Sequence, residues 1–176
     1  MNSGNFSAVK KIPFLLLLTV LLLSGCGLLV APEVKEFDLR VNRNSVPGTV
    51  RVAAVRNLSN SGQRFLLRTN NVLTRDPYNF WTVEPGTLIC NALNRIFKEN
   101  KTLPVQVFIC DVDCFETDPE QSTFRLSGSF RKQGTTEKYR FDITVPVEEQ
   151  SAEYIVSAAS SAVEKLAVLL SGTAKK

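Results

Sequence analysis

The chain of 176 residues contains no histidine and only one methionine and one tryptophan. Without histidine it lacks the usual general base, the usual activator of a nucleophile and the commonest metal ligand. It also has no phosphate-cradling glycine loop, no nucleophile elbow and no CxxC pair. These absences predict a protein that is not an enzyme and that has no catalytic residue, no cofactor and no metal site.

Long runs of like charge are absent as well. The chain carries 21 Lys and Arg against 17 Asp and Glu, and the basic residues are scattered along it. This pattern argues against a nucleic-acid partner. The acidic run from Asp111 to Glu120 resembles a calcium loop only loosely, because it lacks the glycine and the terminal glutamate at the required spacing. It is predicted to be a solvated loop after a strand.

The most informative feature that is present is Leu23-Ser24-Gly25-Cys26, which closes an apolar run that begins at Ile12. Lys10 and Lys11 precede about 12 apolar residues, the arrangement of a secretory signal. Small residues directly before a cysteine are typical of a bacterial lipoprotein signal. We therefore predict a signal peptide over residues 1–25, lipidation of Cys26 with acyl chains such as palmitate, and a tether over residues 26–35.

A membrane-spanning helix over Ile12–Ala31, about 20 uncharged residues, is the alternative. Pro13 near its start and the Gly25-Cys26-Gly27 interruption argue against a spanning helix. Both interpretations place residues 32–176 across the inner membrane. The residue after the lipidated cysteine is Gly27 and not an aspartate, which favours export to the outer membrane, with the domain facing the periplasm.

Three further cysteines, Cys90, Cys110 and Cys114, would then lie in a compartment where disulfides persist. Cys110 and Cys114 are four residues apart on a predicted strand, roughly 13 Å, so they could bond to each other only if the chain turned between them. A bond from Cys90 to either, or no bond at all, remains open.

The rest of the chain, about 150 residues, suffices for one domain, which we place at residues 36–172. Alternating apolar residues predict strands, and apolar residues at helical spacing predict two helices. The predicted strands are Glu36–Val41, Val50–Val55, Arg64–Thr69, Leu103–Phe115 as a central strand, and a hairpin of Phe124–Arg131 with Tyr139–Val145. The predicted helices are Pro85–Glu99 and Ser151–Leu170, and Val46-Pro47-Gly48 is a predicted turn. This order predicts an α/β (α+β) domain with a mixed β-sheet of about six strands and two helices packed on one face.

An aromatic stretch, Tyr78-Asn79-Phe80-Trp81, lies between a predicted strand and the first predicted helix, shortly after Arg68. One interpretation is a hydrophobic plug over the helix start. The other is a protein-contact surface of Arg68, Tyr78, Phe80 and Trp81, because Trp, Tyr and Arg dominate the energetics of interfaces.

These residues also carry a family resemblance. The opening Phe37-Asp38-Leu39, a valine-rich second strand, Arg68 with its asparagine-rich sequel, Trp81 with Pro85 and an alanine-rich last helix occur in an order that resembles the ABC-type transport auxiliary lipoproteins, the group that includes paraquat-inducible protein C. The resemblance extends from about Phe37 to Leu170. The three extra cysteines and the loop Asn57–Gln63 depart from it.

The resemblance implies a non-enzymatic auxiliary component of a lipid transport system that links the inner and outer membranes. The expected partners are a mammalian-cell-entry-type tunnel protein and ABC transporter components, with a homo-oligomer as a further expectation. The alternative is an envelope assembly or pilotin-like secretion lipoprotein, and a small periplasmic hydrolase ranks third.

Overall fold

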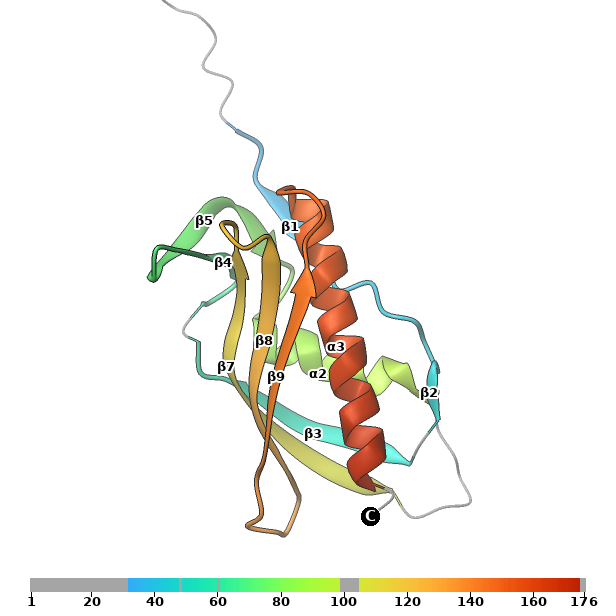
Figure 1. The fold of residues 1–176 in the computed structure, drawn as a ribbon. Coiled ribbons are helices and arrows are strands. Elements are labelled where there is room, and N and C mark those ends of the chain that lie inside the picture. The colour runs from blue at the N-terminus through green and yellow to red at the C-terminus, as the bar shows by residue number, and fades with distance from the viewer. Residues whose placement is uncertain (1–31, 48, 60, 99–104, 175–176) are drawn as a thin grey trace, which may run out of the picture. The chain divides into compact units, whose positions relative to one another are not determined.

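Strand β7, Gln106–Asp118, is the centre of a seven-stranded mixed sheet in the computed structural model (Figure 1). The structure describes residues 32–47, 49–59, 61–98 and 105–174, and the chain from Val34 onward forms one compact unit. One edge of β7 pairs antiparallel with β8, Thr123–Lys132. Its other edge pairs in parallel first with β3, Val50–Asn57, and then with β4, Arg64–Thr69. A central strand is therefore confirmed, but it extends to Asp118 and not only to Phe115, and the first two residues of the predicted range Leu103–Phe115 lie outside the described residues.

Further strands extend the sheet on both sides, in the order β1-β5-β4-β7-β8-β9. Strand β9, Tyr139–Pro146, pairs antiparallel with β8. Strand β5, Val72–Trp81, pairs antiparallel with β4, and β1, Lys35–Phe37, pairs in parallel with the end of β5. A separate two-stranded sheet joins β2, Val46–Pro47, to β6, Phe97–Lys98.

Two helices, α2 (Pro85–Ile96) and α3 (Ala152–Ala174), pack on the sheet and on each other. Helix α2 begins at a proline, whose missing N–H is not needed in a first turn, and the Glu84 carboxylate accepts the N–H of Thr87 at 3.2 Å. Helix α3 buries a stripe of small residues, among them Ala159 and Ala162 with no exposed area. Alanine lets its backbone approach the sheet closely.

Helix α3 is the single helix of the described ranges that is long and apolar enough to cross a membrane. Its most apolar window is 61% buried inside the fold, as expected for a core helix. The spanning helix considered from the sequence, Ile12–Ala31, lies outside the described residues. The signal peptide and Cys26 lie outside them too.

The predicted fold class is confirmed: a single mixed α+β unit with two helices on one face of the sheet. Strand β4 and the start of α2 match the predicted bounds, whereas β5 was not predicted. Other bounds need correction. The first strand ends at Phe37, α2 ends at Ile96, and Val46–Pro47 pairs as a strand in place of the predicted turn.

A glycine makes the central pairing possible. The register of β7 against β8 shifts between Val112 and Cys114, and Gly128 lies opposite Val112. A Cβ atom at Gly128 would overlap the backbone carbonyl of Asp111. The bulge therefore requires glycine at this position.

Candidate interaction surface

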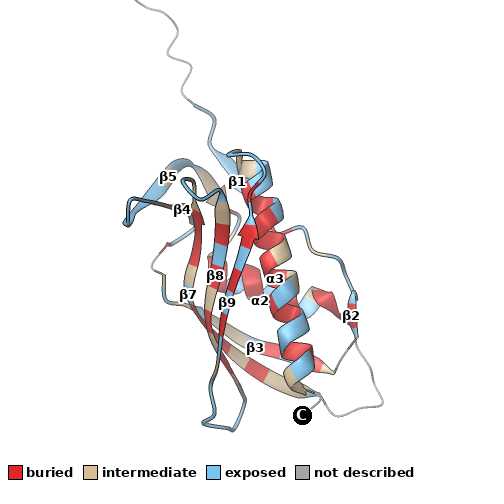
Figure 2. Cartoon of the chain, in the orientation of Figure 1, coloured by how far each residue is buried: buried red, intermediate tan, exposed pale blue. Residues whose placement is uncertain are grey.

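Strands β4 and β5 form a hairpin, residues 64–81, which we call the β4–β5 arm. Asn70 and Asn71 connect the strands with φ angles of 49° and 63°. Two left-handed residues give a turn whose twist matches that of the strands, and asparagine tolerates this conformation well. Figure 2 shows that the arm is mostly exposed, in contrast to the buried bands on β7, α2 and α3.

Exposed apolar side chains gather on this arm. Val72 is 60% exposed, Leu73 41% and Tyr78 45%, and Val34, directly before β1, is 61% exposed. Leu73 lies opposite Arg68 across the hairpin. Val72 and Leu73 were not among the contact residues predicted from the sequence. The available signal was two apolar residues directly after an Asn-Asn turn.

Trp81 requires a correction. Its side chain is 2% exposed and stacks on Phe65, with ring centroids 4.2 Å apart, and its ring lies 5.2 Å from that of Phe115. Phe37, the register partner of Trp81 in β1, joins this cluster, with its ring centroid 5.5 Å from that of Phe65. Trp81 is therefore part of the core and is not exposed for direct contact with a partner. The hydrophobic plug is the interpretation that fits it.

Tyr78 and Phe80 lie nearer to the surface. Phe80 is half-buried, and the Arg64 guanidinium lies over its ring at 5.2 Å from the centroid. The Asp76 carboxylate accepts the backbone N–H groups of Tyr78 and Asn79 at 2.8 and 3.0 Å. This local turn bends β5 and leaves Tyr78 in solvent. Their proposed contact with a partner remains a prediction.

Arg68 is bound within the fold. Its guanidinium donates from Nε and Nη2 to both carboxylate oxygens of Glu116, whose side chain is 5% exposed. This hydrogen bond raises the pKa of Arg68. Because the pair anchors β4 to β7, Arg68 positions the arm and is poorly placed to be a free contact residue.

Similar pairs follow the sheet face opposite the helices. Arg125 donates two hydrogen bonds to Asp142, at 2.9 and 2.7 Å, and this interaction lowers the pKa of Asp142. The Asp111 carboxylate forms ion pairs with the Arg56 guanidinium at 2.6 Å and with the Lys138 ammonium at 3.7 Å. Several charges on this face are therefore matched to one another.

The acidic run needs correction too. Asp111, Asp113 and Glu116 lie within β7, which continues to Asp118, so they do not form a loop. Only from Asp118 does the chain turn, with its Oδ1 accepting the N–H of Glu120 at 3.0 Å. No group of three or more potential metal ligands occurs among residues 32–47, 49–59, 61–98 and 105–174.

The three cysteines of the domain are free. Cys110 is buried in the core, whereas the bulge places Cys114 beside Ser127. Burial raises the pKa of Cys110 and that of Cys114 to about 12, and it also raises the pKa of Cys90. These thiols are therefore protonated and weakly nucleophilic at neutral pH.

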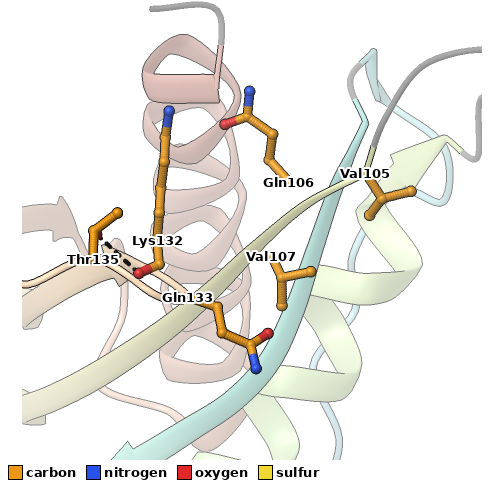
Figure 3. Close-up of a pocket in the computed structure, with 6 residues that line it drawn as sticks. All are labelled: Val105, Gln106, Val107, Lys132, Gln133 and Thr135. Carbon is orange, nitrogen blue, oxygen red and sulfur yellow. Dashed lines mark hydrogen bonds between the residues drawn. The ribbon is translucent and has the colours of Figure 1, made fainter.

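An open hollow lies where β7 begins and β8 ends (Figure 3). Gln106 donates from its amide nitrogen to the Ala174 carbonyl at 2.6 Å, which caps α3. In Figure 3 the side chains that line the hollow do not converge on one point. Their polar groups are thus not arranged around a shared ligand position. The lining residues are Val105, Gln106, Val107, Lys132, Gln133 and Thr135.

Comparisons with known proteins yield similarity of fold alone. No family model matches the chain, and no curated protein does. The crystal structure of a Xanthomonas campestris protein described with the family-model DUF330 has a TM-score of 0.60 and 17% identity, covering 81% of this chain and 95% of that one. A crystal structure described as an uncharacterized protein has a TM-score of 0.62 and 10% identity, covering 81% and 97%.

Proposed function

We propose that this chain is a membrane-anchored periplasmic lipoprotein that acts as a non-enzymatic auxiliary component of an ABC and mammalian-cell-entry-type lipid transport system. Its role is to connect the tunnel protein of that system to the outer membrane. The observation that carries the proposal is the β4–β5 arm, which exposes Val72, Leu73 and Tyr78.

The anchor supports this role. Lipidation at Cys26 places the membrane nine residues before Lys35, where β1 enters the sheet. Nine extended residues reach about 30 Å, so the domain stays close to the membrane and its partner must approach it there. Two or three acyl chains on Cys26 would hold the protein there durably, since each buried methylene contributes about 0.8 kcal/mol.

The chemistry of the surface supports an adaptor more than an enzyme. In the part of the chain that the structure describes, the cysteine thiols have raised pKa values, and the acidic side chains of Asp111, Glu116 and Asp118 serve ion pairs and a turn. The similarity of fold to the DUF330 structure is compatible with the family resemblance of the sequence.

A pull-down of the lipidated chain from detergent-solubilised envelopes tests the proposal. We expect a mammalian-cell-entry-type tunnel protein, with ABC transporter subunits, to be retained. A chain with Cys26→Ser controls for proteins that associate through the lipid anchor. Recovery of a secretin subunit with no transport component would favour the pilotin-like alternative instead.

A further inference from the structure

We propose that an open hollow on the sheet face opposite the helices binds a small zwitterion, an aminoalkyl phosphate, with its phosphate at Arg140 and its ammonium group at Asp113. The hollow lies over the middle of β8 and is bordered by β7 and β9. The inference is independent of the proposed function, because it rests only on the residues that line this hollow.

A β-bulge brings Asp113 to the hollow. The register of β7 against β8 shifts between Val112 and Cys114, so Asp113 is the extra residue of β7. Its side chain is exposed and lines the hollow, whereas Val112 before it is buried. Gly128, opposite Val112, lines the hollow without a side chain and leaves it open. Bulges redirect side chains and are frequent beside functional sites.

Two opposite charges line this hollow without pairing with each other. In the part of the chain that the structure describes, neither Asp113 nor Arg140 forms an ion pair. The other two charged residues of the lining, Arg125 and Asp142, pair with each other through hydrogen bonds of 2.9 and 2.7 Å. The charges of the lining therefore sum to zero. A ligand that carries both signs is complementary to it, whereas a simple anion or cation meets a matching charge at one side only.

The strand register decides which end of the hollow takes the anion. Arg140 and Asp111 lie opposite the same residue of β8, Ser129. The Asp111 carboxylate is already shared by Arg56 and Lys138. It has no negative charge left to offset Arg140, so this end of the hollow is positive and is suited to the phosphate.

The other end of the hollow carries the carboxylates. Asp142 lies opposite Ser127, and Ser127 lies opposite Cys114, the residue that follows Asp113. Asp113 and Asp142 thus flank β8 from its two sides. Because Arg125 occupies both oxygens of Asp142, Asp113 is the carboxylate that is available to an ammonium group.

The hydrogen-bond donors favour phosphate as the anion. All five N–H groups of Arg140 are available, and Arg125 uses Nε and Nη2 for Asp142 but retains Nη1. A phosphate group offers more acceptor oxygens than a carboxylate does. Guanidinium groups also bind phosphate through paired hydrogen bonds. A phosphate therefore satisfies these donors more fully than the carboxylate of an amino acid would.

An NMR titration of the full chain in an uncharged maltoside detergent tests the inference. The probe is phosphoethanolamine, and the controls are inorganic phosphate, ethanolamine and free glycine. We expect phosphoethanolamine to give saturable shifts of the backbone amide resonances of Asp113, Ser127 and Arg140. Each control should bind roughly tenfold more weakly, because it lacks one of the two charges or the phosphate oxygens.

The same headgroup chemistry occurs in lipids and in free aminoalkyl phosphates. Glycerophosphoethanolamine separates the two sources, because its phosphate is a diester, as in a lipid. Binding as tight as that of phosphoethanolamine would assign a lipid headgroup. Binding roughly tenfold weaker would assign the free monoester, which carries more charge on its phosphate. Either result supports a zwitterion site.

Three variants at exposed positions locate the two ends of the ligand. Arg140→Gln should weaken binding of both phosphoethanolamine and inorganic phosphate roughly tenfold, since both need the guanidinium. Asp113→Asn should weaken binding of phosphoethanolamine alone. Arg51→Gln is the matched control and should change neither, because Arg51 is an exposed strand arginine outside the hollow.

Four results would overturn the inference. They are the absence of shifts at these amides, equal binding of phosphoethanolamine and inorganic phosphate, equal binding of free glycine, and an equal loss of binding in Arg51→Gln.

Discussion

Strands β9 and β5 belong to one sheet but differ in how they meet solvent. In β9, exposed residues alternate with buried Phe141, Ile143 and Val145, because helix α3 covers one face. In β5, residues 72–75 are exposed in succession. Where helices cover the sheet, burial in the core accounts for the apolar residues. In the β4–β5 arm it does not account for Val72 and Leu73, and contact with another protein is our explanation.

The contrast is sharpest within β5 itself, between Trp81 and Tyr78. Trp81→Ala should destabilise the fold by about 3 to 5 kcal/mol, because it opens a cavity among Phe65 and Phe115. Tyr78→Ala should change stability by less than about 0.5 kcal/mol. Urea denaturation of both variants measures the difference. Similar losses would mean that the two ends of β5 are not distinct.

The next effect concerns the core pairing of β7 with β8. Gly128→Ala should cost about 3 kcal/mol, because its Cβ would overlap the Asp111 carbonyl and shift the backbone. Gly172→Ala, in α3 with open space around it, should be neutral or stabilise by up to about 1 kcal/mol. Thermal and urea unfolding check this pair. A harmless Gly128→Ala would show that the bulge is adaptable.

A smaller effect is expected where the arm joins the core. Glu116→Gln should cost about 1 to 2 kcal/mol, less than the 3 to 5 typical of breaking a fully buried pair, because the Arg68 side chain is 36% exposed. Glu148→Gln, at an exposed loop position, serves as the control. Equal unfolding midpoints for the two variants would show that Arg68 does not anchor the arm.

The smallest expected effect depends on pH and concerns an ion pair on the sheet face opposite the helices. Arg125 holds the pKa of Asp142 below its ordinary value, so this pair stabilises the fold above about pH 4, and the contribution is lost as the pH falls through the lowered pKa. Both side chains are at least half exposed, so Asp142→Asn should cost at most about 0.5 kcal/mol at neutral pH. Stability curves of the variant and the natural chain should converge in acid. A difference in stability between the two proteins that increased in acid would contradict the assigned role of the Arg125–Asp142 pair.

Much of the fold was predictable because its elements are strongly periodic. Phe124–Arg131 and Tyr139–Val145 alternate in sequence, and the hairpin of β8 and β9 follows that pattern. The last helix was recognisable from its repeating alanines, which pack on the sheet as expected.

The second half of the arm was less predictable, because β5, unlike β4, breaks those patterns. Asp76 and Pro77 interrupt β5, whose exposed residues show no alternation, so the sequence did not indicate a strand. The pairing of Arg68 with Glu116 connects residues 48 positions apart, which no local pattern reveals. For Trp81 the sequence left a hydrophobic plug and a contact surface open, because its burial depends on Phe65 and Phe115 from other strands.

Site-specific photo-crosslinking tests the central claim most directly, namely that the β4–β5 arm contacts a lipid-transport partner. A photoreactive amino acid replaces Leu73 in the full chain or, as the control, Val168, and intact envelopes are irradiated. The account predicts an adduct with the mammalian-cell-entry-type tunnel protein from position 73 and none from position 168. An adduct from position 168 alone, or none with a transport component from either position, would contradict it.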